Sequence, residues 1–100
     1  MSEFSSASNV KERIKVKKPP LYKVLMINDH YSTMEFVVEV LTNVFHKLEH
    51  EAQSIMLDVH KKGKGLCGVY SREIAETKIE KAHQMASSQG HPLKCQMELE

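Results

Sequence analysis

Three polar side chains follow directly after the first apolar run of this chain of 100 residues. The run "LYKVLMI", residues 21–27, ends in Asn28, Asp29 and His30, and a helix-start signal comes next. An amide, a carboxylate and an imidazole together offer several hydrogen-bond acceptors and a negative charge. They indicate either a small polar binding site at the mouth of a helix or a simple turn, because Asn and Asp often form turns before helices.

A second set of residues has helical spacing. Met34 and Val37 are three positions apart, while Met56, Val59 and His60 stand at i, i+3 and i+4, so the members of each set share one helix face. If the two helices pack side by side, they form an apolar patch rimmed by Asn, Asp and His. Simpler interpretations stay open, since methionine commonly fills cores and a histidine near a helix C-terminus is a favourable cation.

Other chemistry has little support in the sequence. His46 and His50 are four apart, but the helical pattern breaks between them, and a closed metal site needs about four ligands in one place. Cys67 lies inside an apolar run, where a thiol is usually inert. "KGKGLCG" lacks the spacing of a phosphate-binding loop. We therefore expect no metal site, no cofactor and no enzymatic activity.

The elements that position these residues follow from hydrophobic periodicity. Residues 21–27 predict a buried strand, and Ser32 with Glu35 forms an S-x-x-E capping box that opens a helix. The apolar stripe of that helix runs from Met34 to Leu48. A second helix covers about 49–60 and ends before Gly63.

The second half of the chain predicts a strand over 66–70, a helix from the cap Ser71 to about residue 88, and an alternating strand over 93–99. The order is β-α-α-β-α-β. We expect an α+β fold in which three helices cover one face of a small three-stranded antiparallel sheet.

Composition narrows the class of protein further. The net charge of +1 gives no general case for binding nucleic acid or an anionic membrane. Residues 1–18 are rich in Ser and charge and predict a disordered extension, with the folded domain over 19–100. No apolar run is long enough to span a membrane, and the N-terminus lacks a signal-peptide core. Cys67 and Cys95 are expected to be reduced core residues in a cytoplasmic protein.

Taken together, the sequence resembles the ClpS family, the adaptors of the bacterial Clp protease machine. The matching stretches are "PPLYKVLMINDHYSTMEFVVEVL", "SIMLDVHKKGKGLCGVYSREIAETK" and "HPLKC". The resemblance spans roughly residues 19–97. It implies an α/β sandwich similar to the C-terminal domain of the ribosomal stalk protein, and a binding module.

The resemblance implies that the chain binds N-degrons, substrates whose first residue is Leu, Phe, Tyr or Trp, and hands them to the ClpA unfoldase for degradation by ClpP. The α-amine acceptors correspond to Asn28, Asp29 and His60. The hydrophobic pocket corresponds to the following residues: Ser32, Met34, Val37, Met56, Val59 and Leu93. Glu73 and Lys78 match positions associated with docking to the ClpA N-terminal domain, and residues 1–18 match the tail that the unfoldase engages.

Two positions depart from the family pattern. His30 stands at the pocket rim where a second Asp is usual, and Thr33 stands where Pro is common. His30 removes a negative charge beside the pocket, which weakens the expected attraction for basic residues later in the degron. The alternative function is a protein-binding domain of ribosomal-stalk type that lacks an amine site.

Overall fold

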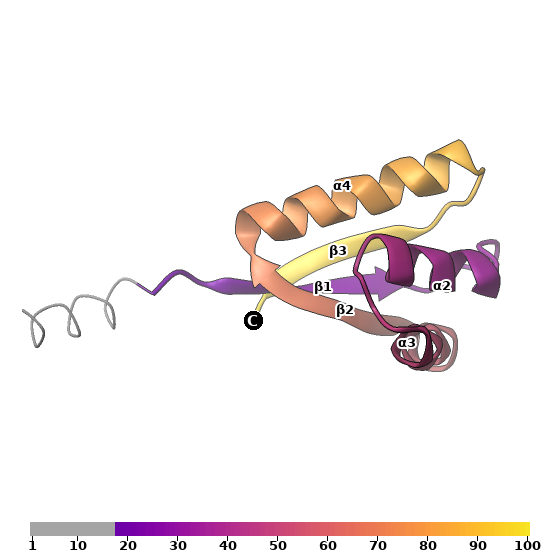
Figure 1. Cartoon of the computed structure of the whole chain (residues 1–100), viewed down its shortest axis with the longest axis horizontal. Coiled ribbons are helices and arrows are strands. Elements are labelled where there is room, and N and C mark those ends of the chain that lie inside the picture. The colour runs from indigo at the N-terminus through magenta and orange to yellow at the C-terminus, as the bar shows by residue number, and fades with distance from the viewer. Residues whose placement is uncertain (1–17) are drawn as a thin grey trace, which may run out of the picture.

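A computed structural model describes residues 18–100 of the chain, and Figure 1 shows the arrangement of its elements. The elements are β1 (Leu21–Ile27), α2 (Met34–Asn43), α3 (Glu49–Lys62), β2 (Lys64–Ser71), α4 (Arg72–Ser88) and β3 (Lys94–Leu99). The three strands form one antiparallel sheet in the order β2-β1-β3. The predicted β-α-α-β-α-β order and α+β fold are confirmed.

One face of the central strand carries the core. Val24 and Met26 on β1 are fully buried and join a single cluster with apolar residues of all three helices. Helix α4 packs across all three strands, while α3 packs on β2 and on α2 (Figure 1). The helix α4 achieves this close approach with small residues, because Ala75, Ala82 and Ala86 are its buried positions.

The two cysteines belong to this core. The register of β1 and β2 shifts between Val24 and Leu25, so Cys67 stands as the extra residue of a bulge and points inward. Cys95 on β3 pairs with Met26. Both thiols are free and buried, as predicted. The interaction with the Cys95 thiol, together with burial, raises the pKa of Cys67 well above its ordinary value.

The start of α2 differs from the predicted capping box. The N-cap is Thr33, whose hydroxyl accepts the N–H of Phe36 at 3.1 Å. Ser32 instead donates its N–H and its hydroxyl to Asp29. The prediction was wrong by one residue. Ser and Thr are both good N-cap residues, and here the Ser32 hydroxyl is already bonded to the Asp29 carboxylate.

The predicted helix ends were only partly correct. Gly63 adopts φ 90° and caps α3 through its N–H to the Val59 carbonyl, as expected for a C-terminal glycine. The stripe predicted to reach Leu48 stops earlier, since α2 ends at Asn43 and Leu48 is 64% exposed at the start of α3. There the Leu48 N–H donates to the carboxylate of Glu51.

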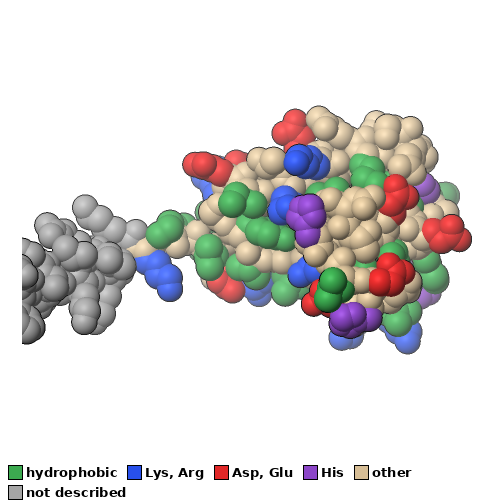
Figure 2. All heavy atoms as spheres, in the orientation of Figure 1, with side chains coloured by type: hydrophobic (Ala, Val, Ile, Leu, Met, Phe, Trp, Pro, Cys, Tyr) green, Lys and Arg blue, Asp and Glu red, His purple; other side chains and the backbone are tan. Residues whose placement is uncertain are grey.

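On the face of the domain that Figure 2 shows, acidic, basic and hydrophobic side chains are interspersed, and no large patch of one charge stands out. Among the described residues, no helix is long and apolar enough to cross a membrane. The predicted disordered extension, residues 1–18, lies outside the described residues except for Lys18.

Candidate functional site

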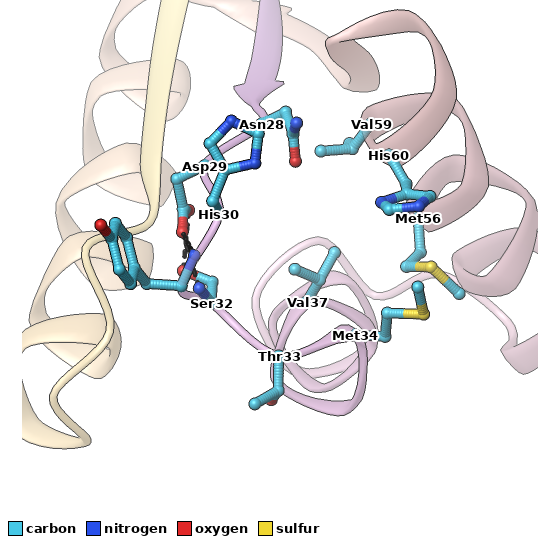
Figure 3. A pocket seen from close by; sticks show the side chains of 11 residues that line it. Asn28, Asp29, His30, Ser32, Thr33, Met34, Val37, Met56, Val59 and His60 are labelled. Carbon is cyan, nitrogen blue, oxygen red and sulfur yellow. Dashed lines mark hydrogen bonds between the residues drawn. The ribbon is translucent and has the colours of Figure 1, made fainter.

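A cavity of about 390 Å³ opens where β1 ends and the helices α2 and α3 meet (Figure 3). One wall comes from the loop that joins β1 to α2, and the other from the last turns of α3. Its lining residues are Asn28, Asp29, His30, Tyr31, Ser32, Thr33, Met34, Val37, Met56, Val59 and His60. The structure thus brings together the two groups that the sequence placed 30 residues apart.

The loop wall is held in shape by Asp29. The backbone N–H groups of Tyr31 and Ser32 donate to its Oδ1 at 2.8 and 2.6 Å, and the Ser32 hydroxyl donates to its Oδ2 at 2.8 Å. Partial burial opposes ionisation of this carboxyl, but the hydrogen bonds outweigh it, so the pKa of Asp29 lies below its ordinary value. The carboxylate is therefore ionised at neutral pH and keeps acceptor capacity on Oδ2.

The backbone fixes Asn28 against the opposite wall. Its N–H donates to the carbonyl of Gly63 at 2.9 Å, which ties the end of β1 to the cap of α3. The side chain lines the cavity, and Figure 3 shows the Asn28 amide at the top of it and the His60 ring at the right, across from Asp29. Two acceptors from different elements thereby flank one space.

The apolar part of the cavity comes from the facing sides of the two helices. Val37 of α2 and Met56 and Val59 of α3 are buried, whereas Met34 at the first turn of α2 is 50% exposed. Buried walls with one exposed methionine at the rim give a hydrophobic recess with an adaptable edge. Met34 is thus not core filler, whereas Met56 belongs to the core cluster and also lines the cavity.

The structure places one predicted pocket residue elsewhere. Leu93 is 4% exposed and belongs to the core cluster, and it does not line this cavity. Conversely, Tyr31 and Thr33 line the cavity although neither was predicted to be a pocket residue. Tyr31 is 80% exposed, and its position in the same loop as Asp29 was the only signal for it.

The two residues predicted for unfoldase docking have different environments. Glu73 is exposed in the first turn of α4. Lys78 is half-buried, donates to the Val44 carbonyl at 2.8 Å and lies 5.7 Å from the Tyr70 ring centroid. Lys78 therefore joins α4 to the end of α2, a structural role that the sequence did not predict.

Within the part of the chain that the structure describes, no group of three or more His, Cys, Asp or Glu side chains is placed to hold a metal ion. The cavity instead combines a negative, acceptor-rich end with an apolar end. Such concave sites with a few convergent polar groups bind small ligands or peptide termini. The fold and cavity together define a small binding domain.

The chain belongs to the ClpS family, the ATP-dependent Clp protease adaptor protein ClpS, and residues 17–96 match the sequence pattern of this family. The chain is 47% identical to the ATP-dependent Clp protease adapter protein ClpS of Syntrophus aciditrophicus over 98 residues, covering 98% of this chain and 92% of the relative. The same-named protein of Desulfatibacillum aliphaticivorans is 57% identical over 86 residues, covering 86% of this chain and 83% of that protein.

A solved structure shares the fold. The structure of Agrobacterium tumefaciens ClpS2 bound to L-phenylalaninamide aligns with a TM-score of 0.80 and 38% identity, covering 83% of this chain and all of that chain. The protein is accordingly an adaptor of the Clp protease, the class that the sequence resemblance predicted.

Proposed function

We propose that the cavity binds the first residue of N-degron substrates and that the chain delivers them to a ClpA-type unfoldase. The observation that best supports this proposal is that one cavity is lined by both polar acceptors and apolar side chains, the two kinds of group that an N-terminal Leu, Phe, Tyr or Trp requires. Its negative rim suits the α-ammonium, and its apolar recess suits the side chain. The ligand of the similar Agrobacterium structure, L-phenylalaninamide, has a free amine and an aromatic side chain.

Three side chains receive the α-ammonium in this proposal. Asp29 supplies the charge and an acceptor, and Asn28 and His60 supply further acceptors, one from the loop after β1 and one from α3. An ammonium has three donors, and hydrogen bonds to charged groups are stronger than neutral ones. His60 must be neutral to accept, because a protonated imidazole has no lone pair to offer.

The side chain of the first residue occupies the recess between α2 and α3. Met34, Val37, Met56 and Val59 form its walls, with Ser32 at its polar end. Two demands, charge and apolar shape, then determine which substrates bind. His30 at the rim leaves the cavity with one carboxylate, which lowers its attraction for basic residues that follow the first.

Delivery uses surfaces away from the cavity. We assign contact with the N-terminal domain of a ClpA-type AAA+ unfoldase to Glu73 and Lys78 on α4, and handover to the tail, residues 1–18. The unfoldase then feeds ClpP in the cytoplasm. Glu73 is the more direct contact of the two, because the Lys78 ammonium already binds the Val44 carbonyl.

A peptide series that differs only in its first residue tests the binding step. Fluorescence titration should show tight binding for peptides that begin with Leu, Phe, Tyr or Trp. Peptides that begin with Ala or Glu should bind at least tenfold more weakly, since they fill little of the recess or oppose its charge. Equal affinity across the series would show that the cavity does not read the first residue.

A further inference from the structure

The face of the sheet that lies opposite the core carries a small apolar cluster of its own. Val24 and Met26 point into the core, and side chains alternate along a strand, so Leu25 between them points to the other face. Leu25 is only 7% exposed, yet it does not belong to the core cluster. Its cross-strand partner Leu66 on β2 is 45% exposed. This face is therefore apolar and partly open to solvent, which is typical of an interaction surface.

The pairing register arranges this surface, which we call the open face, in three rows that run across the strands. From β2 to β3 the first row is Val69, Lys23 and Glu98, the middle row is Leu66, Leu25 and Gln96, and the third row is Lys64, Ile27 and Lys94. Apolar side chains therefore occupy the centre of the open face. The two ends of β3 carry opposite charges, Glu98 in the first row and Lys94 in the third.

Under a two-fold axis the open face is complementary to itself. An axis that runs across the strands through the middle row places the middle rows of two copies on each other, and sets the first row of one copy against the third row of the other. Lys94 of each copy then faces Glu98 of the other copy, so the ion pair forms twice. Leu25 and Leu66 meet their own counterparts at the centre. Sheets that pack face to face lie about 10 Å apart, a gap that long Lys and Glu side chains can bridge.

The charged side chains at the two ends of β3 are available to a second copy. Both Lys94 and Glu98 are exposed, and neither takes part in a salt bridge within residues 18–100. The remaining lysines of the open face, Lys23 and Lys64, face apolar side chains of the other copy. Their aliphatic stems can lie along that surface while the ammonium groups reach solvent. Repulsion among these lysines limits the affinity between the two copies.

We propose that the open face binds a second copy of this chain and forms a weak two-fold dimer. A second copy fits better than an unrelated partner, because the apolar row lies on the axis and the charges at the two ends of β3 are opposite. Strands about 4.8 Å apart and residues about 3.3 Å apart give the face an extent of roughly 14 by 20 Å, which is at the low end for a specific interface. The dimer should therefore form only at high protein concentration. No residue of the open face lines the cavity between β1, α2 and α3, so both copies keep an open cavity.

Sedimentation velocity of the full chain at about 10 µM to 1 mM, a range in which weak association is detected, tests the dimer. The mean mass should rise with concentration from 11.4 kDa toward twice that value, and added salt should weaken the association. Leu66→Gln should weaken dimerisation about tenfold or more, because an apolar side chain is lost from each copy at the centre. Lys94→Glu should weaken it roughly 2- to 30-fold, because two ion pairs become two like-charge pairs.

Two further variants make the test specific to this geometry. Lys94→Glu combined with Glu98→Lys exchanges the charges at the net charge of the parent, and it should restore dimerisation. Lys81→Glu makes the same charge change at an exposed position of α4; as the matched control it should leave the dimer unchanged. All variants should keep the parental Kd for a Phe-initiated peptide, so the outcome does not depend on the proposed function. Circular dichroism checks that each variant is folded.

Three results would overturn the proposal. A parent chain that stays at 11.4 kDa at every concentration would refute the dimer. A dimer that persists unchanged in Leu66→Gln, or that the exchanged charges do not restore, would place the contact on another surface. If the parent is monomeric and Leu66→Gln instead lowers binding to a ClpA-type unfoldase, the open face binds a different protein and not a second copy.

Discussion

The carboxylate of Asp29 makes three hydrogen bonds to its own loop and lines the cavity at the same time. From the sequence, a turn-forming role and a ligand-binding role were alternatives for this residue. The geometry makes them compatible, because the loop bonds orient the carboxylate and leave one acceptor position on Oδ2. A group held in place this way loses little freedom when a ligand arrives.

Two substitutions separate the roles of Asp29. Asp29→Asn keeps one oxygen that can accept both N–H groups but loses the charge and the oxygen that accepts from the Ser32 hydroxyl, so it should lower the unfolding free energy less than Asp29→Ala does. Its Kd for a Phe-initiated peptide should rise roughly 10- to 150-fold, the equivalent of losing about 1.5–3 kcal/mol from a charged hydrogen bond. Asp29→Ala should lose as much affinity and also lower the unfolding free energy by about 1 kcal/mol or more. Peptide titration and urea unfolding measure the two effects; parental affinity in Asp29→Asn would make Asp29 a turn former alone.

The helices and strands could be predicted where burial of one face of the element sets the spacing of apolar residues in the sequence. The 21–27 run, the Ala-lined face of α4 and the Gly63 cap all carry such signals, and the structure has them in place. Such patterns do not decide between two neighbouring residues that can both cap a helix, as Ser32 and Thr33 can at the start of α2. They also fail for Leu93, because alternation reveals that a residue is buried but not which cavity or core it faces.

One contact between elements is expected to depend on pH. His83 on α4 accepts the N–H of Cys95 on β3 through Nε2 at 2.9 Å, which requires the neutral ring. Partial burial and the nearby Lys94 cation lower the pKa of His83 from its ordinary 6.5. The unfolded chain therefore takes up this proton at a higher pH than the folded chain does. The stability that this bond contributes is present above pH 6.5 and is lost as the pH falls below it.

The unfolding free energy should accordingly drop more between pH 7 and pH 5 in the parent than in His83→Gln. Glutamine keeps an acceptor oxygen but does not titrate, and the other histidines contribute equally to both proteins. Urea unfolding at a series of pH values measures the difference. Parallel stability curves for the two proteins would show that the bond from α4 to β3 does not depend on proton uptake by His83.

At the scale of the whole molecule, binding and delivery are assigned to separate parts of the chain. The cavity residues named above lie at the end of the domain where β1 meets α2 and α3. The proposed function gives residues 1–18 a role in handover and gives the cavity the role of binding. The two activities should therefore be separable by truncation.

Deleting residues 1–16 should leave the Kd for a Phe-initiated peptide unchanged, because the cavity residues Asn28 to Val37 and Met56 to His60 remain. The same deletion should strongly slow degradation of an N-degron substrate by ClpA with ClpP. Peptide titration and a degradation assay on the same preparation provide the comparison, with the full-length chain as the control. Degradation at the parental rate would remove the tail from the delivery mechanism.

The most direct test of the central claim is whether the cavity reads a free α-amine. A fluorescence titration compares one Phe-initiated peptide with its N-acetylated form, which differs only by the loss of the cation. Acetylation should weaken binding to the parent by at least tenfold, and the loss should not add to that of Asp29→Asn, because both changes remove the same charge pair. Equal affinity of the free and acetylated peptides for the parent protein would contradict the assignment of Asn28, Asp29 and His60 to N-terminal recognition.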